Sequence, residues 1–226
     1  NEAENIKRLI PGILSLGKKY NILVVDDNSP DGTAAIVHTI AQKEPRVSLL
    51  KRSRKLGLGS AYIDGIKSVL SDSDYIFEMD ADLSHDYRDL PRFIKKMKEF
   101  DILIGSRYVD GVRVTNWSFS RLLLSYFGNL TICLITGLET SDNTSGFKCF
   151  KRHVLKAINL DRVYSKGFSF QVEMNYRAAK KNFKLGEIPI VFKERASGAS
   201  KLSFNIVKET IWVLCKLRLG PVFKKR

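Results

Sequence analysis

The sequence predicts an α/β fold in which a mainly parallel, Rossmann-like sheet is flanked by helices. Short apolar runs alternate with amphipathic segments of about ten to fifteen residues through the first half of the 226-residue chain, as in βαβ units. The apolar runs are nearly continuous, which is typical of parallel strands buried on both faces. Carboxylate pairs stand at the ends of two runs, where open sheets of this kind bind their ligands.

The first half is predicted to contain four strands and three intervening helices, after an opening segment with a helical pattern, "NEAENIKRLI". The strands are the short apolar runs at 20–27, 46–52, 75–80 and 101–106. The helices cover 32–43, 60–70 and 89–100. The first of these helices follows the turn sequence Asn-Ser-Pro-Asp-Gly, and the second follows a Gly-rich turn.

The second half is less regular. A helix is predicted over 168–180 and a strand over 184–194, followed by a polar, Gly-containing loop at 195–201. A last helix is predicted over 204–219, with an apolar stripe of Phe204, Val207, Ile211, Trp212, Leu214 and Leu217. No repeat or linker interrupts the chain. We therefore expect one domain at 1–202 and a C-terminal extension at 203–226.

The extension is predicted to lie at a membrane surface. Segment 201–226 holds seven Lys or Arg residues and one acid, Glu209, which gives a net charge of +6. A basic helix with Phe204 and Trp212 on one apolar side is typical of helices attracted to anionic lipid. A last helix that packs on the core, followed by a solvated tail, explains the same pattern.

Segment 117–137 is a second candidate for the membrane surface. It is apolar, but Arg121 and Asn129 interrupt it, so we do not expect it to cross a bilayer.

The overall charge of +14 predicts an anionic partner, such as nucleic acid, an acidic membrane or a phosphorylated substrate. No aromatic stacking pattern or nucleic-acid-binding module is recognisable, so we expect no nucleic-acid partner. Cys133, Cys149 and Cys215 lie far apart and show no metal-ligand spacing. This distribution suits a reducing compartment and argues against a disulfide framework or a zinc site.

Asp80 and Asp82 are candidate metal ligands. If both lie at the end of a strand, they project on one face about 6 to 7 Å apart. Two bare carboxylates there would repel by roughly 2 to 3 kcal/mol at an effective dielectric constant near 20. A divalent cation would remove that repulsion, and oxygen ligands suit Mg²⁺ or Mn²⁺. Alternatively, Asp82 caps the following turn and Asp80 is solvated.

Two further stretches suit a nucleotide-bearing ligand. Asp27, at the end of the first strand, is a candidate acceptor for a nucleobase N–H, whereas Asp31 or Thr33 would cap the next helix. The stretch "KLGLGSAYIDG" contains Gly57 and Gly59 in a Gly-x-Gly turn. Such a turn before a helix suits a diphosphate group. Close helix packing explains it equally well, and Tyr62 replaces the third Gly of a dinucleotide fingerprint.

Four basic residues are candidate phosphate contacts. Arg107 follows the fourth strand, Arg121 lies in the apolar segment one turn before Ser125, and Arg195 and Lys201 lie in the polar loop. Guanidinium groups bind phosphate bidentately and stay charged, so several facing one cleft would suit a reaction between phosphorylated substrates. Each of the arginines would equally serve as a surface charge.

The chain resembles the polyprenol-phosphate (dolichol-phosphate) mannose synthases, which are family 2 glycosyltransferases with the GT-A fold. The motifs that carry the resemblance occur in the family's order: "NEAEN", "VVDDNSPDGT", "KLGLGSAY", "MDADLSH", "GSRY", "DNTSGFKCF" and "ERASGASK". Asp-x-Asp is generic to the fold, whereas "KLGLGSAY" together with "DADLSH" is specific to this subfamily. The resemblance covers nearly the whole chain.

The resemblance implies an inverting transfer of mannose from GDP-mannose to a polyprenyl (dolichyl) phosphate, with Mg²⁺ or Mn²⁺. It implies donor contacts from Glu2, Asp27, Gly59, Asp80, Arg195 and Lys201, and acceptor-phosphate contacts from Arg107, Arg121 and Ser125. Asp80, Asp82, Arg107 and Arg121 would carry catalysis. Asp80 and Asp82 would hold the metal. Ser84 is a third candidate metal ligand. Relatives often have Gln at this position, so in this chain water is the alternative third ligand.

The lipid acceptor implies a peripheral enzyme on the cytoplasmic face of a membrane, the endoplasmic reticulum in a eukaryote or the plasma membrane in a prokaryote. Small membrane-anchoring subunits are conceivable partners. Family members usually have a central strand before the Asn-Glu of residues 1–2, and its absence from this sequence would leave two strand edges open.

Three alternatives remain open at the level of sequence. The scaffold would also suit glucose or another nucleotide-linked sugar, because few residues read the base or the sugar hydroxyls. A non-catalytic nucleic-acid-binding protein is suggested by the charge alone. A degenerate scaffold subunit is disfavoured, because both Asp-x-Asp acids and all three arginines are present.

Overall fold

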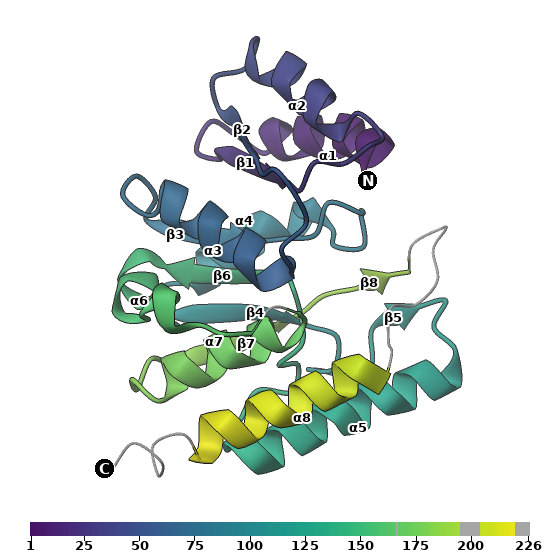
Figure 1. Cartoon of the computed structure of the whole chain (residues 1–226), viewed down its shortest axis with the longest axis vertical. Coiled ribbons are helices and arrows are strands. Elements are labelled where there is room, and N and C mark those ends of the chain that lie inside the picture. Colours follow the sequence, from purple (N-terminus) through teal and green to yellow (C-terminus); the bar gives the residue numbers. More distant parts are fainter. Residues whose placement is uncertain (166, 195–203, 220–226) are drawn as a thin grey trace.

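A computed structural model describes residues 1–165, 167–194 and 204–219, and Figure 1 shows their arrangement. The strands are β1 (Ile22–Asp26), β2 (Val47–Lys51), β3 (Tyr75–Glu78), β4 (Ile102–Ser106), β5 (Val114–Thr115), β6 (Lys148–Lys151), β7 (Leu185–Pro189) and β8 (Phe192–Lys193). The α-helices are α1 (Ala3–Ser15), α2 (Thr33–Ala41), α3 (Leu58–Val69), α4 (Leu90–Lys96), α5 (Phe119–Thr136), α6 (Arg152–Ala157), α7 (Ser169–Ala179) and α8 (Phe204–Leu219). Two 3₁₀ turns, Tyr87–Asp89 and Leu160–Arg162, complete the list.

The expected α/β fold is confirmed, and its main sheet also contains an antiparallel strand. The strands pair in the order β3-β6-β4-β7; β4 and β7 run parallel, and β6 runs antiparallel to both β3 and β4. The sequence analysis missed β6 because it is short and carries Lys148 at a fully buried position. The Lys148 ammonium is satisfied by the Gln171 carbonyl and by Asn175 Oδ1, at 2.9 Å each. Both partners lie on α7, far along the chain.

The strands β1 and β2 form a separate parallel pair at one end of the molecule. Among the described residues, β1 pairs only with β2 and β3 pairs only with β6, so each has one edge without a strand partner. The helix α3 contacts both β1 and β3, and a Cβ on its Gly65 would lie 2.9 Å from Val25 Cγ2. Close packing of α3 therefore connects the two blocks.

The helices α5 and α8 lie side by side below the sheet (Figure 1). Val213, Leu214 and Leu217 of α8 are buried against Ile132 of α5 and Val172 of α7. Part of the apolar stripe predicted on 204–219 thus packs on the domain, as the alternative interpretation held. Trp212 remains 56% exposed.

The other predicted elements are present with shifted bounds. The strand expected over 184–194 is divided into β7 and β8, and the helix expected over 89–100 is reduced to α4 and the 3₁₀ turn before it. The short elements β5 and α6 were not predicted. The loop at 195–201 lies outside the described residues.

Candidate active site

The strand β3 ends at Glu78, and Asp80 and Asp82 lie in the loop just beyond its carboxyl end. The Tyr62 hydroxyl donates to Asp80 Oδ1 at 3.3 Å, and the Asp80 backbone N–H donates to His85 Nδ1 at 3.3 Å. Leu83 adopts a left-handed backbone conformation with φ of 60°. The loop therefore turns back on itself and brings the His85 ring next to Asp80.

Asp82 is oriented by Ser84. Its Oδ1 accepts the Ser84 backbone N–H at 3.0 Å and also the Ser84 hydroxyl. The turn-capping interpretation of Asp82 is therefore correct. Because the Ser84 hydroxyl is buried and donates to Asp82, its position is that of a group supporting a ligand; a direct bond from Ser84 to a metal stays a prediction.

The two carboxylates fit a hard divalent cation with an incomplete protein shell. Within residues 1–165, 167–194 and 204–219, no group of three or more His, Cys, Asp or Glu side chains is placed to hold a metal. A Cβ on Gly146 would stand 3.5 Å from Asp80 Oδ2, in ordinary van der Waals contact, so this glycine borders the carboxylate. A cation held by Asp80 and Asp82 would need its other oxygen ligands from a substrate or water.

Two side chains next to the carboxylates, Tyr62 and His85, have pKa values shifted toward their neutral forms. Burial raises the pKa of Tyr62 well above its usual value, and the carboxylates of Asp80, Glu78 and Asp82 raise it further. Burial also lowers the pKa of His85, despite the opposing effect of Asp80 and Asp82. A neutral His85 imidazole can accept the hydrogen bond from the Asp80 backbone.

A buried acid–base pair lies beneath this loop. Glu78 on β3 faces Lys148 on β6, and Gln171 Nε2 donates to Glu78 Oε2 at 2.9 Å. Burial raises the pKa of Glu78 and lowers that of Lys148, each to about 7. Glu78 lies two residues before Asp80, so this buried pair is close to the carboxylate loop.

Arg107 follows β4 and is locked in place by Asp142. Its Nε and Nη2 donate to the two Asp142 oxygens at 2.7 and 2.6 Å, and its backbone N–H donates to Asp142 Oδ2 at 3.0 Å. Nη2 also donates to the Thr144 hydroxyl at 2.7 Å. Asp142 is fully buried, and Arg107 holds the pKa of its carboxyl below the usual value although burial alone would raise it. The fork of Arg107 is therefore rigid.

The structure brings Arg107, Arg121 and Ser125 together. The Trp117 ring lies 5.4 Å from the Arg107 guanidinium carbon and 4.2 Å from that of Arg121. The Tyr108 hydroxyl and Ser125 Oγ are 2.6 Å apart. Arg121 also forms an ion pair with Glu194, the last described residue before the gap at 195–203. The three predicted acceptor residues thus form one aromatic-lined cationic group.

The Phe192 side chain lies between the carboxylate loop and the cationic group. The Phe192 ring lies 5.5 Å from the His85 ring, 5.6 Å from the Arg107 guanidinium carbon and 5.7 Å from the Trp117 ring. His85 also stacks on Phe147 at 5.1 Å. The strand β8, which carries Phe192, therefore joins the acidic half of the site to the basic half.

Asp27 is paired with a buried arginine that the sequence analysis did not consider. Arg52 lies at 3.1 Å from Asp27 Oδ1 and 3.3 Å from Asp64 Oδ2, and its Nη2 donates to Ser60 Oγ at 2.7 Å. Ser60 lies in the first turn of α3, two residues before Tyr62. The first turn of α3 therefore links the carboxylate at the end of β1 to the carboxylates after β3.

Glu2 lies beside the loop that follows β1. Its backbone N–H donates to Thr33 Oγ1 at 3.1 Å, and the next N–H, from Ala3, donates to Asp31 Oδ2 at 3.0 Å. Asp31 also accepts the Thr33 backbone N–H and hydroxyl, and these bonds lower its pKa to about 2. Asp31 therefore fastens the start of α2 to the start of α1, and Glu2 and Asp27 come from neighbouring segments.

Gly59 is required by close packing. A Cβ there would stand 2.3 Å from the Ser165 carbonyl oxygen and 3.1 Å from the Phe170 ring. The packing interpretation of the Gly-rich turn is therefore confirmed, while a diphosphate contact at Gly59 stays a prediction. Arg195 and Lys201 lie outside the described residues.

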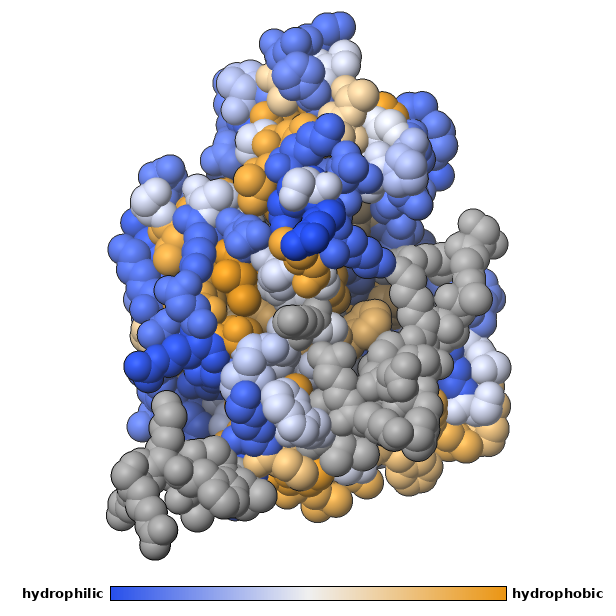
Figure 2. Space-filling model, in the orientation of Figure 1, coloured by the Kyte–Doolittle hydropathy of each residue, from blue (hydrophilic) through white to orange (hydrophobic). Residues whose placement is uncertain are grey.

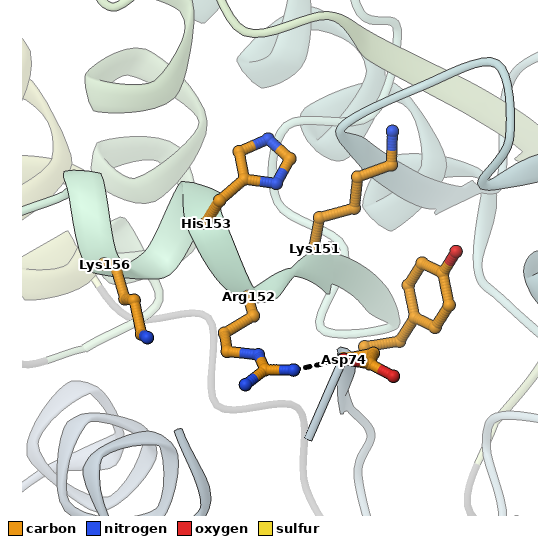
Figure 3. Close-up of a pocket in the computed structure, with 6 residues that line it drawn as sticks. Asp74, Lys151, Arg152, His153 and Lys156 are labelled. Atoms are coloured by element: carbon orange, nitrogen blue, oxygen red, sulfur yellow. Dashed lines mark hydrogen bonds and ion pairs between the residues drawn. The ribbon is translucent and has the colours of Figure 1, made fainter. Parts of the chain in front are cut away.

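A hollow of about 370 Å³ is found elsewhere, at the opposite end of β3 (Figure 3). Asp74, Lys151, Arg152, His153 and Lys156 line it together with Tyr75. Arg152 is paired with Asp74, and Lys151 lies 3.2 Å from Asp101. None of the predicted site residues contributes to this hollow.

Several residues of the site were not identified from sequence: Tyr62, His85, Trp117, Asp142 and Arg52. Tyr62, His85 and Asp142 are inside the quoted motifs, so their position in those motifs was the available signal. Trp117 and Arg52 have no such signal, because their roles depend on partners that only folding brings close.

Comparison with known proteins gives consistent matches. Residues 1–158 match the model of the family described as glycosyl transferase family 2. The chain is 40% identical over 212 residues to an undecaprenyl-phosphate mannosyltransferase of Micrococcus luteus, covering 93% of this chain and 87% of that protein. It is 39% identical over 215 residues to a polyprenol monophosphomannose synthase of Mycolicibacterium smegmatis, covering 94% and 81%.

Among solved structures, the fold is similar to glucosyl-3-phosphoglycerate synthase from Mycobacterium tuberculosis. The complex of that enzyme with Mn²⁺, UDP and glucosyl-3-phosphoglycerate gives a TM-score of 0.64 at 15% identity, covering 96% of this chain and 76% of that one. Its complex with Mg²⁺ and UDP gives a TM-score of 0.65 at the same identity and coverage.

Proposed function

Since this chain belongs to glycosyltransferase family 2, we propose that it transfers mannose from GDP-mannose to a polyprenyl (dolichyl) phosphate. The two curated relatives, near 40% identity over most of their length, are named for mannosyl transfer to such lipids. The GT-A fold places the relevant side chains beyond the carboxyl ends of β1, β3 and β4. The product would be polyprenyl-phosphate mannose.

One observation carries this proposal: a carboxylate pair and an arginine pair lie on either side of Phe192 and His85. Such a site suits two substrates that both carry phosphate and repel each other. Arg107 and Arg121 would bind the acceptor phosphate, with Ser125 beside them. Glu2 and Asp27 would hold the guanosine, and Gly59, Arg195 and Lys201 would lie along the donor diphosphate.

The reaction needs no base from the protein. A phosphate monoester has a second pKa of about 6 and is already dianionic in large part at pH 7. Its oxygen attacks the anomeric carbon of mannose, the bond to the GDP oxygen breaks with inversion, and the electron pair leaves with GDP. Arg107 and Arg121 would lower the repulsion as the acceptor approaches, and their fixed positions would align it.

Asp80 and Asp82 would hold a Mg²⁺ or Mn²⁺ ion, which when bound supplies positive charge to the departing diphosphate. Ser84 would keep the Asp82 carboxylate oriented, and His85 would hold the loop through the Asp80 backbone. Tyr62 would fix the Asp80 carboxylate through its hydroxyl.

The lipid acceptor also implies a location for the protein in the cell. A polyprenyl chain stays in a bilayer, so we place the enzyme peripherally on the cytoplasmic face of a membrane. Small membrane-anchoring subunits are compatible with this placement.

The direct test is a transfer assay with radiolabelled GDP-mannose, GDP-glucose and UDP-glucose against one polyprenyl phosphate. We expect lipid-linked label from GDP-mannose only. Label from a glucose donor instead would identify a polyprenyl-phosphate glucosyltransferase on the same scaffold, and no labelled lipid from any donor would contradict the proposal.

Replacing Arg121 with alanine is expected to raise the KM for the lipid phosphate about tenfold or more, with a smaller change in the KM for GDP-mannose. Loss of one charge-assisted phosphate contact has about this effect. Steady-state kinetics with each substrate varied in turn would check it. A larger rise in the donor KM would contradict the assignment of Arg121 to the acceptor.

A further inference from the structure

The helix α5 carries a single asparagine, and it lies on the inward side. The buried residues of the helix are Asn129, Ile132 and Thr136, whereas the outward side includes Phe119 and Leu134, which are 73% and 78% exposed. In Figure 2 apolar surface lies along the lower edge of the molecule, where Figure 1 places α5. Because apolar side chains occur on both sides, hydrophobic burial alone does not define which side of α5 faces the protein. A buried polar group with fixed partners can define it.

Asn129 has partners at both ends of its side-chain amide. It is 3% exposed, and its Oδ1 accepts the backbone N–H of Asn143 at 2.8 Å. Its Nδ2 donates to the Ser125 carbonyl at 3.0 Å and to the Thr144 hydroxyl at 3.4 Å. Leaving a buried amide group without such partners costs about 1 to 3 kcal/mol. These bonds therefore favour one rotation and one position of the helix along its axis.

The Thr144 hydroxyl is shared between α5 and Arg107. It accepts from Arg107 Nη2 at 2.7 Å and from Asn129 Nδ2, and it donates to Asp142 Oδ1 at 3.2 Å. A threonine hydroxyl has one donor and two acceptor positions, so this hydroxyl is fully used. Asn129, Thr144 and Arg107 therefore form a continuous hydrogen-bonded chain.

The segment between α5 and β6, which provides the partners of Asn129, is itself fixed to the core. Asn143 is fully buried, and its Oδ1 accepts from Asn175 Nδ2 on α7 at 3.1 Å. The Asp142 backbone N–H donates to the Glu187 carboxylate on β7 at 2.9 Å. Asn129 thus attaches α5 to a part of the protein that α7 and β7 hold in place.

We propose that Asn129 is a positioning residue for the acceptor: through Thr144 it sets the placement of Arg121 and Ser125 relative to Arg107. The inference rests on the proposed function, which assigns the acceptor phosphate to these three residues. Ser125 lies one turn before Asn129 on α5, and Arg121 lies two turns before it. A phosphate bound by both arginines needs their separation fixed, because small displacements of aligned groups weaken binding and catalysis strongly.

The first turns of α5 have a second attachment to the same region. The Tyr108 hydroxyl lies 2.6 Å from Ser125 Oγ, and the Arg121 guanidinium carbon lies 4.2 Å from the Trp117 ring. Loss of Asn129 is therefore expected to shift the helix rather than to detach it, and its effect on the acceptor is expected to be graded.

The main test is Asn129→Leu, which keeps the approximate size of the side chain and removes both ends of the amide. We expect the KM for the lipid phosphate to rise about tenfold, as for the loss of one aligned hydrogen bond. The KM for GDP-mannose should stay unchanged, because the predicted donor residues lie outside α5. An unchanged KM for the lipid phosphate overturns the inference. If Asn129→Leu does not fold, Asn129→Asp replaces it, since an aspartate keeps an acceptor for the Asn143 N–H and loses the donation to Thr144.

Thr136→Val is the matched control. It also removes a buried polar group from the inward side of α5, but the Thr136 hydroxyl donates to the Ile132 carbonyl of the same helix at 2.6 Å. Both KM values should equal those of the unmodified chain. A rise in the lipid-phosphate KM equal to that of Asn129→Leu would show a general effect of polar loss in α5 and would overturn the specific role of Asn129.

A double variant tests whether Asn129 acts through Thr144. Thr144→Val removes the shared hydroxyl and should raise the KM for the lipid phosphate by itself. If the two side chains act on Arg107 in one chain, adding Asn129→Leu to Thr144→Val gives little further rise. Rises that multiply would show independent effects and would contradict the proposed connection.

A measurement without substrates separates this inference from the proposed function. In a Trp212→Phe background Trp117 is the only tryptophan, and its ring contacts Arg121. We expect Asn129→Leu to increase the quenching of Trp117 fluorescence by acrylamide and Thr136→Val to leave it unchanged. Increased quenching supports the positioning role even if no sugar is transferred and the proposed function fails. Unchanged quenching in Asn129→Leu overturns the positioning role, whatever the transfer assay shows.

Discussion

Replacing Asp82 with asparagine is expected to reduce mannosyl transfer by about 10³-fold and to leave the fold intact. The change removes one of the two negative charges that would hold the cation, and losses of this size follow when a group that stabilises developing charge is removed. Asparagine keeps an oxygen that can accept both hydrogen bonds from Ser84. The measurement is kcat/KM at a series of Mn²⁺ concentrations, together with a thermal melt by circular dichroism.

Ser84→Ala is the matched control for Asp82→Asn. It removes the hydroxyl that orients Asp82 without removing a carboxylate, and the expected loss is about 10- to 100-fold. A direct metal bond from Ser84 would instead make the two variants equally inactive. Full activity of Asp82→Asn would remove the metal role from Asp82 and with it the proposed arrangement of the donor.

Replacing Arg107 with lysine is expected to lower kcat/KM for the lipid phosphate about 10²-fold or more. Lysine keeps a positive charge beside the buried Asp142, so the carboxylate is not left without a counter-charge. It cannot reproduce the fork that binds both Asp142 oxygens, and the fixed direction of the guanidinium toward a phosphate is lost. Arg107→Ala is a poorer test, because an unpaired buried carboxylate destabilises a protein by about 3 to 5 kcal/mol.

Two comparisons make the Arg107 prediction specific. Arg152→Lys changes an arginine paired with Asp74 at the opposite end of the sheet, and it should leave kcat/KM unchanged. Asp142→Asn should lower kcat/KM for the acceptor while Arg107 is still present, because the guanidinium is no longer held. Normal acceptor kinetics in Arg107→Lys would exclude a phosphate contact at this position.

The site holds its charged groups rigidly, and these groups would offset the repulsion between the two phosphorylated substrates. The carboxylate loop is held by Tyr62, Ser84 and His85, and Arg107 is held by Asp142. Fixed groups of opposite charge stabilise a transition state without having to reorganise during the reaction. For a phosphate nucleophile that needs no activation, this support is the main contribution that the protein can make.

Much of the site follows from sequence because parallel strands place their carboxyl ends along one edge. Asp27, Asp80 and Arg107 each follow an apolar run, and the structure places each of them just beyond β1, β3 or β4. The Gly-rich turn before α3 shows a limit of the same method. The pattern located the turn, but the 2.3 Å approach of Ser165 to a Cβ on Gly59 depends on residues about a hundred positions away.

By itself, the sequence determined the α/β alternation, the positions of the acidic and basic candidates, and the family. The tertiary structure decided that β6 runs antiparallel through a buried Lys148, that Asp142 holds Arg107, and that α5 turns apolar side chains outward while Leu214 and Leu217 of α8 are buried. The physical reason is common to all three. Local periodicity shows that a segment has an apolar or charged side, but which surface covers that side depends on partners distant in the chain.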